Sequence, residues 1–141
     1  VHAVIETNRG HDLGRVLWEG SAEPDTGQPR TVKGRTATRV LRAPATGYVQ
    51  AHFAIGDVIR EGETIATVGG EPIIAAFDGV LRGIIHERVH VSAGLKVGDL
   101  DPRGIHQMCF RISDKALAVG GGVVQAVLSS PVVRQRIQTI P

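Results

Sequence analysis

The first cluster of residues whose types suggest chemistry is Arg9-Gly10-His11-Asp12, near the start of the chain. A histidine beside an aspartate has the residue types of a general base with an orienting carboxylate, or of two metal ligands. Neighbouring side chains on a strand point to opposite faces, however, and an aspartate in a tight loop often bonds its own backbone. Two interpretations therefore stay open, a functional loop and a turn fixed by Asp12.

A second cluster contains two carboxylates and a guanidinium within five residues, Asp99, Asp101 and Arg103. Carboxylates two residues apart on a loop could bind a hard cation, or they could orient Arg103 toward an anion. The alternative is an Asp-Pro turn that its own hydrogen bonds hold in place.

A third cluster joins Ser113-Asp114-Lys115 to a run of three glycines, Gly120 to Gly122. Ser113 is a typical helix N-cap, and Asp114 is well placed for the helix macrodipole, so we predict a helix over 114–128. Lys115 near this helix start would suit a phosphate-bearing ligand. The glycines either permit close packing, which we favour, or break the helix into a backbone-lined anion pocket.

Cys109 is the single cysteine, which rules out an internal disulfide and any multi-cysteine metal centre. A lone thiol can be a nucleophile, but we expect Cys109 to be buried on a strand over 108–112. His86 and His90 are four residues apart in a segment that we expect to be strand and turn, so no metal site is predicted there.

Composition excludes several function classes. The 141 residues are 42% hydrophobic and 21% charged, which is typical of a globular domain, and no apolar run approaches the roughly 20 residues that span a bilayer. The formal net charge is +2 and the basic residues are scattered, so nucleic acid is not an expected partner. We expect no membrane association and, with one cysteine, a cytoplasmic location.

Short strands joined by tight turns should position these clusters, because Val and Ile dominate and 18 glycines are spread along the chain. The segment from Arg42 to Val97 contains two similar halves. Gly47 and Gly62 in the first half have counterparts in Gly79 and Gly94, at a constant offset of 32 residues. The fold class predicted is mainly β.

Other elements are expected on either side of this repeat. We predict short strands over 3–6, 14–18 and 36–41, a turn-rich segment over 20–34, and a tail over 132–141 with a possible final strand. The chain should form one compact unit with three parts: N-terminal strands and turns over 1–41, the repeat over 42–103, and a strand, helix and tail over 104–141.

The repeat resembles the biotinyl/lipoyl-type fold, a barrel-sandwich hybrid made of two half-motifs. The resemblance rests on "APATGYV" followed by "GDVIREGETIATV", and on the echo "AFDGVLRG" followed by "VSAGLKVG". It implies a cofactor-bearing lysine on the hairpin between the halves, which corresponds to 68–72. That hairpin has no lysine, so neither biotin nor lipoate is an expected cofactor.

Most of the chain also resembles the C-terminal region of accessory proteins of selenium-dependent molybdenum hydroxylases. The segments "ETNRGHDLGRV", "GLKVGDLDPR" and "ISDKALAVGGGV" carry this resemblance. It implies a role in maturation of a client molybdenum hydroxylase, with the molybdenum cofactor as a transient ligand. It also implies a Rossmann-like N-terminal half that is missing here; Val1 is not an initiator Met.

Taken block by block, the resemblance marks these residues as candidates for cofactor binding: Arg9, Gly10, His11, Asp12, Asp99, Asp101, Arg103, Ser113, Asp114, Lys115, Gly120, Gly121 and Gly122. In one hypothesis they hold an anionic pterin-phosphate, with Arg9, Arg103 and Lys115 facing its negative charge. In a second, the fold is a non-catalytic module that docks the client or forms a homo-oligomer. A third makes Cys109 a sulfur carrier.

Overall fold

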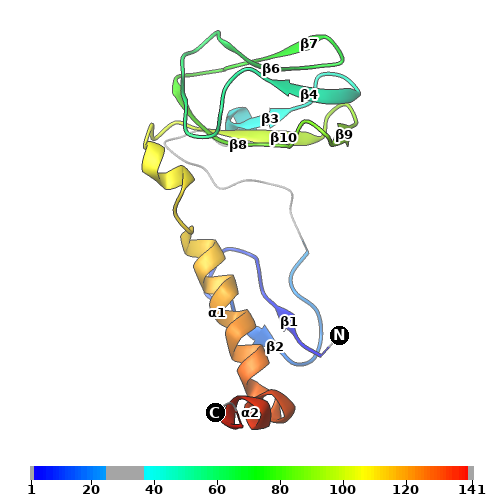
Figure 1. The fold of residues 1–141 in the computed structure, drawn as a ribbon, viewed down its shortest axis with the longest axis vertical. Coiled ribbons are helices and arrows are strands. Elements are labelled where there is room, and N and C mark those ends of the chain that lie inside the picture. The colour runs from blue at the N-terminus through cyan, green and yellow to red at the C-terminus, as the bar shows by residue number, and fades with distance from the viewer. Residues whose placement is uncertain (1, 25–36, 140–141) are drawn as a thin grey trace. The chain divides into compact units, whose positions relative to one another are not determined.

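A computed structural model describes residues 2–24 and 37–139 of the chain (Figure 1). The chain forms two compact units: unit 1 contains residues 1–26 and 112–141, and unit 2 contains residues 27–111. This division differs from the single unit with boundaries near 41 and 103 that the sequence predicts. The first residues of the chain pack with its C-terminal helix, a contact between distant segments that local sequence patterns do not reveal.

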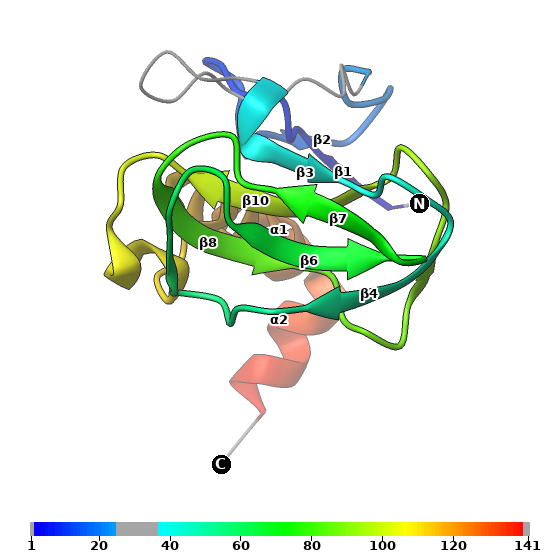
Figure 2. The same cartoon turned by 90° about the horizontal axis from the view of Figure 1, so that it is seen from above.

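Unit 2 is mainly β, as predicted. Its strands form two antiparallel four-stranded sheets, with the orders β3-β10-β8-β5 and β7-β6-β4-β9 (Figure 2). The strands are β3 (Val40–Arg42), β4 (Gly47–Ala51), β5 (Val58–Ile59), β6 (Thr64–Val68), β7 (Glu71–Ile74), β8 (Gly79–Ile84), β9 (His90–Val91) and β10 (Lys96–Asp101).

The internal repeat is confirmed, because the offset of 32 residues carries β4, β5 and β6 onto β8, β9 and β10. The same offset carries β3 onto β7, so the two sheets have equivalent strand orders. Gly62 and Gly94 occupy matching turns with φ values of 85° and 82°. Only glycine adopts this backbone region without strain, which explains why both halves keep a glycine there.

The hydrophobic core of unit 2 lies between the two sheets, and its residues all fall between positions 41 and 100. Phe77, Ile59, Ile65, Leu81 and Leu100 are its largest fully buried side chains. Burying an aliphatic or aromatic side chain of this size stabilises a fold by about 1.5–3 kcal/mol. The core therefore holds β8 and β10 in place, and these strands carry the second polar cluster.

Unit 1 consists of a short hairpin and two helices: β1 (Val4–Ile5), β2 (Val16–Leu17), α1 (Asp114–Ser129) and α2 (Pro131–Gln138). The predicted helix over 114–128 is confirmed and continues to Ser129. It is unbroken at the glycine run, and Gly122 is its one buried residue, packed on Gly14 of the hairpin. Close packing of the glycines, the favoured alternative, is therefore confirmed at Gly122.

Three predicted elements are wrong. Residues 37–39 form a 3-10 turn (η1) before β3, instead of the first half of a strand. The expected strand around Cys109 is a second 3-10 turn, η2 (His106–Cys109), because the backbone bonds locally, with the amide of Met108 donating to the carbonyl of Ile105 at 3.1 Å.

The expected C-terminal tail is helix α2, which Pro131 begins at a position where its missing amide hydrogen costs nothing. The turn-rich segment predicted over 20–34 lies mostly outside the described residues, which resume at 37. Within the described ranges, no single helix is both long and apolar enough to cross a bilayer; only α1 and α2 taken together, with η2 and a bend of 81°, meet that criterion by length and composition.

Candidate functional site

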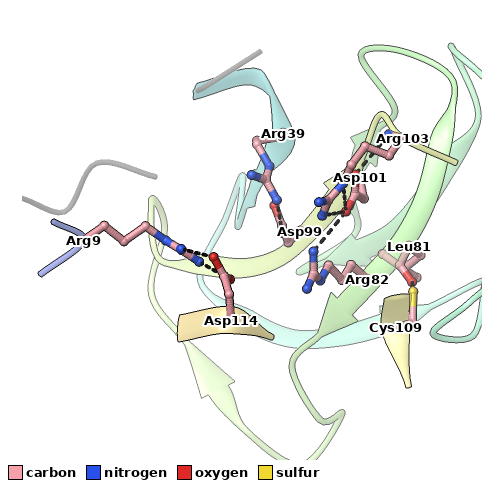
Figure 3. Close-up of polar contacts among 9 residues, drawn as sticks. All are labelled: Arg9, Arg39, Leu81, Arg82, Asp99, Asp101, Arg103, Cys109 and Asp114. Carbon is pink, nitrogen blue, oxygen red and sulfur yellow. Dashed lines mark hydrogen bonds and ion pairs between the residues drawn. The ribbon is translucent and has the colours of Figure 1, made fainter. Parts of the chain in front are cut away.

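In unit 1 the first and third polar clusters lie together. The guanidinium of Arg9 donates two hydrogen bonds to the carboxylate of Asp114, at 2.7 and 3.0 Å, across 105 positions of sequence (Figure 3). This two-pronged geometry is the strong form of an arginine–carboxylate pair. Hydrogen bonding to Asp114 also raises the pKa of Arg9. The pair ties the loop after β1 to the first residue of α1.

The N-terminus of α1 is capped as the sequence predicts. The hydroxyl of Ser113 accepts a hydrogen bond from the amide of Ala116 at 3.1 Å. Asp114 follows in the first turn, where a negative charge favours the helix macrodipole. Ser113 and Asp114 therefore both have structural roles at the start of the helix.

The His11-Asp12 pair does not form a base with its orienter. The carboxylate of Asp12 pairs with Arg15 at 2.7 Å, and the carbonyl of Asp12 accepts from the amide of Arg15 at 2.9 Å. His11 is exposed on the same loop. Asp12 therefore fixes a turn, which is the structural one of the two interpretations of this loop.

Glu6, which sequence reasoning missed, binds two backbone amides of unit 1. Its buried carboxylate accepts from the amides of Asn8 at 2.7 Å and Glu23 at 2.9 Å. These backbone hydrogen bonds lower the pKa of Glu6, and the charge of Lys115 acts in the same direction. The position of Glu6 at the end of a short apolar strand was the available signal, because a buried carboxylate needs donors nearby.

In unit 2 the second cluster forms two groups of ion pairs, one at Asp99 and one at Asp101 (Figure 3). Asp99, on β10, accepts from Arg39 at 2.6 Å. Asp101, two residues later and 3% exposed, accepts from Arg103 and from Arg82. The cluster that the sequence placed on a loop therefore belongs mostly to strand β10.

Asp101 binds two arginines, Arg82 and Arg103. Its Oδ1 atom accepts from the backbone amide and Nε of Arg103 at 3.0 and 2.9 Å, and its Oδ2 atom accepts from Nη2 of Arg103 at 2.5 Å and from Nη1 of Arg82 at 3.1 Å. Burial alone would raise the pKa of Asp101, but the hydrogen bonds and charge of Arg103, with the bond from Arg82, outweigh it and hold the pKa well below its usual range. Asp101 is therefore ionised at neutral pH.

Arg82 is the second residue that sequence reasoning missed. Gly83 pairs with Asp99 and Leu81 pairs with Leu100, so Arg82 is an extra residue at an irregularity between β8 and β10. Bulges of this kind turn a side chain away from the regular alternation of a strand. At this irregularity the guanidinium of Arg82 reaches Asp101. In the sequence, only the "GVLRG" segment indicated that Arg82 could have such a role.

Cys109 lies in η2, partly buried, with its thiol donating weakly to the carbonyl of Leu81 at 3.7 Å. Burial raises the pKa of the thiol, which is the direction opposite to that of an activated nucleophile. The structure thus gives the sulfur-carrier hypothesis no chemical support.

The predicted site residues fall into two sets. Arg9 and Asp114 meet in unit 1, where Lys115 lies close enough to affect Glu6, and Asp99, Asp101 and Arg103 belong to unit 2. Gly120 and Gly121 have open space where a Cβ would stand. Among residues 2–24 and 37–139, no group of three or more His, Cys, Asp or Glu side chains has the arrangement of a metal site.

These features define a protein with a mainly β unit and a separate helical unit, whose conspicuous acidic residues are mostly bound to arginines of the same chain. Comparison with known proteins gives one close relative by sequence. No family model matches the chain. The chain is 46% identical over 127 residues to the uncharacterized protein YqeB of Escherichia coli K12. This match covers 90% of the chain and 24% of YqeB. The chain thus spans about a quarter of the length of this relative.

Two solved structures are distantly similar. An aspartoacylase family protein from Mesorhizobium loti is 19% identical, with a TM-score of 0.40, over 49% of this chain and 26% of that one. A succinylglutamate desuccinylase/aspartoacylase from Rhodobacter sphaeroides is 23% identical, with a TM-score of 0.38, over 59% of this chain and 29% of that one. Similarity at this level assigns no activity.

Proposed function

We propose that this chain is part of an accessory protein for the maturation of selenium-dependent molybdenum hydroxylases, and that it acts in the cytoplasm by docking the client enzyme or handling its molybdenum cofactor. The observation that carries the proposal is the assembly of unit 1. Two of the segments that carry the resemblance, one near each end of the chain, are joined there by the Arg9–Asp114 pair and by the packing of Gly14 on Gly122.

We further propose that unit 2 is a barrel-sandwich hybrid of the biotinyl/lipoyl type that carries no swinging arm. Its support is the repeat, with two sheets of equivalent strand order. The hairpin between β6 and β7 turns at Gly69 and Gly70, with φ values of 59° and 87°, and offers no lysine amine. A Cβ at Gly69 would lie 2.9 Å from the carbonyl oxygen of Thr46, so this turn excludes a side chain there.

Docking is better supported than cofactor handling. Most carboxylates in the three motif segments bind arginines of the same chain, in the pairs Asp12–Arg15, Asp114–Arg9, Asp99–Arg39 and Asp101–Arg103. An arginine that binds a carboxylate through several nitrogens, as Arg9 and Arg103 do, has fewer donors left for a cofactor. The motif residues therefore serve chiefly to stabilise the two units, whose surfaces are then available to dock a client.

The apolar face of α1 is the observation that favours an interaction module. Leu117, Val124 and Leu128 are 68, 57 and 46% exposed, and their spacing of seven and four residues places them on one side of the helix. Gly121, between them, has open space around it. Exposed apolar residues grouped in this way are typical of a protein–protein contact.

The test measures binding of the chain to a purified molybdenum hydroxylase client that lacks its cofactor. We expect a saturable complex that Val124→Asp weakens at least about tenfold, because the substitution places a charge in the contact. Gln125→Asp is the matched control, since it adds the same charge to α1 at an exposed polar position. Equal affinities for the two variants would contradict docking through α1.

A second arm measures the thermal midpoint of the chain with and without the molybdenum cofactor. A ligand that binds only the folded state must raise this midpoint. Stabilisation without client binding would favour cofactor handling. Binding of neither would overturn the proposed function, and self-association that Val124→Asp abolishes would instead favour the dimerisation module.

A further inference from the structure

We propose that Arg82, supported by Arg103 on the carboxylate of Asp101, forms a binding site in unit 2 for an oxyanion of the phosphate or carboxylate type. The site deepens the proposed function and rests on it for its biological ligand, an anionic group of the molybdenum cofactor. Its geometry rests only on contacts within unit 2.

The first argument is one of hydrogen bonds. The two oxygens of Asp101 already accept from the backbone amide, Nε and Nη2 of Arg103. Arg82 adds one longer bond at 3.1 Å through Nη1. A guanidinium has five N–H donors in a planar fork, and among the described residues Arg82 uses this one only. Its other donors are available to a ligand.

Accessibility is the second argument. The side chain of Arg82 is 25% exposed, whereas that of Asp101 is 5% exposed. Within the described part of the chain, two side-chain atoms are buried and have no hydrogen-bond partner, and neither belongs to Arg82. The unused donors of Arg82 therefore reach solvent, while the anion that holds it in place is below the surface.

The sharing of Asp101 is the third argument. Of the four side-chain hydrogen bonds that described residues donate to the carboxylate of Asp101, three come from Arg103 and one comes from Arg82. A partly buried arginine that is held by one such bond keeps an edge of its guanidinium for a ligand, and that edge matches the planar, two-oxygen recognition of phosphates and carboxylates.

The backbone supplies a fourth, independent argument. Arg82 is the residue left out of register where β8 meets β10. Such irregularities occur often next to functional sites because they redirect a side chain. The rigid core beneath β8, with Leu81 fully buried, fixes the base of this side chain. The site is therefore held ready before a ligand arrives.

The experiment titrates inorganic phosphate, and in a separate arm acetate, into the isotope-labelled chain at constant ionic strength, and follows the arginine Nε–H resonances by NMR. We expect saturable shifts of Arg82 and Arg103 with at least one of the two anions. Arg82→Met should weaken binding at least about tenfold, because it removes charge-assisted hydrogen bonds to the anion. Arg88→Met, which removes an exposed arginine from the same unit, should leave affinity unchanged.

Arg82→Lys keeps the charge and removes the fork, so it should also weaken binding, and it decides the matter if Arg82→Met fails to fold. The proposal is overturned if phosphate and acetate act no differently from chloride, or if Arg82 and Arg88 variants bind alike. Anion binding by a chain that binds neither client nor cofactor would overturn the proposed function while leaving this site intact.

Discussion

At the scale of single residues, Asp101 has the greatest influence on unit 2. It is buried, it accepts hydrogen bonds from two arginines, and those bonds keep its pKa far below the ordinary value. Asp101→Asn should lower the free energy of unfolding at pH 7 by about 3 kcal/mol, because it leaves two partly buried cations without their counter-charge. Urea denaturation measures this, with the exposed Glu87→Gln as a control expected to change stability by less than about 0.5 kcal/mol.

The same residue predicts a pH dependence. A carboxyl whose pKa is depressed in the folded state contributes stability above its unfolded pKa of about 3.9 and loses it as the pH falls toward the folded value. The wild-type chain should therefore lose stability steadily below about pH 4, and Asp101→Asn should show a shallower loss. Parallel pH profiles for the two proteins would contradict the role given to Asp101.

Residue types and spacing led to Asp99, Asp101 and Arg103 but missed Arg82 and Glu6. The first three stand together in one polar segment, which a sequence displays directly. Arg82 joins them only because β8 and β10 pair with an irregular register, and Glu6 matters only because Asn8 and Glu23 turn their amides toward it. Both contacts depend on the folded path of the chain.

At the scale of elements, α1 depends on a glycine at one position and tolerates a side chain at the next. A Cβ at Gly122 would collide with the carbonyl oxygen of Gly14, whereas a Cβ at Gly121 would meet nothing within 4 Å. Gly122→Ala should destabilise unit 1 by about 1–3 kcal/mol through overpacking. Gly121→Ala should stabilise it by up to about 1 kcal/mol, because alanine favours the helix.

Helix content followed by circular dichroism during thermal unfolding separates these two variants. An equal response to both substitutions would mean that the glycine run serves flexibility instead of packing. The comparison also probes the docking surface, since Gly121 lies on the exposed apolar side and Gly122 does not.

The caps of the two helices offer another matched pair. Ser113 accepts the amide of Ala116 at the start of α1, whereas Ser130, which precedes α2, makes no side-chain cap bond. Ser113→Ala should cost about 1 kcal/mol of stability, and Ser130→Ala should cost much less. Chemical denaturation followed by helix signal measures both, and a larger effect at Ser130 would refute this assignment of the caps.

Elements with a regular sequence period could be predicted from the sequence, whereas elements without such a period could not. The 32-residue repeat and helix α1 followed from glycine spacing, the serine cap and the apolar pattern. The 3-10 turns at 37–39 and 106–109 overlap the strands predicted over 36–41 and 108–112, because β-branched or apolar residues in both segments favour strands. Helix α2 was missed because Pro131 was interpreted as an end, although proline also suits the first turn of a helix.

At the scale of the whole molecule, the two units differ in their cores. The cluster of buried apolar residues lies wholly in unit 2, whereas in unit 1 Val16 is the only described apolar side chain classed as buried. Since hydrophobic burial is the main favourable contribution to stability, we expect unit 1 to open first. Hydrogen exchange should show less protection for the amides of α1 than for those of β6, β8 and β10, and equal protection would contradict this order.

Unit 1 is discontinuous, because unit 2 is inserted between its two segments. During synthesis the strands of unit 2 emerge from the ribosome complete, while the hairpin of residues 2–24 waits for a helix that has not yet been translated. A premature stop after residue 111 would thus release a protein with an intact β unit and a hairpin lacking its cover. Residues 112–141 therefore decide whether the hairpin is covered, because α1 packs on both of its strands.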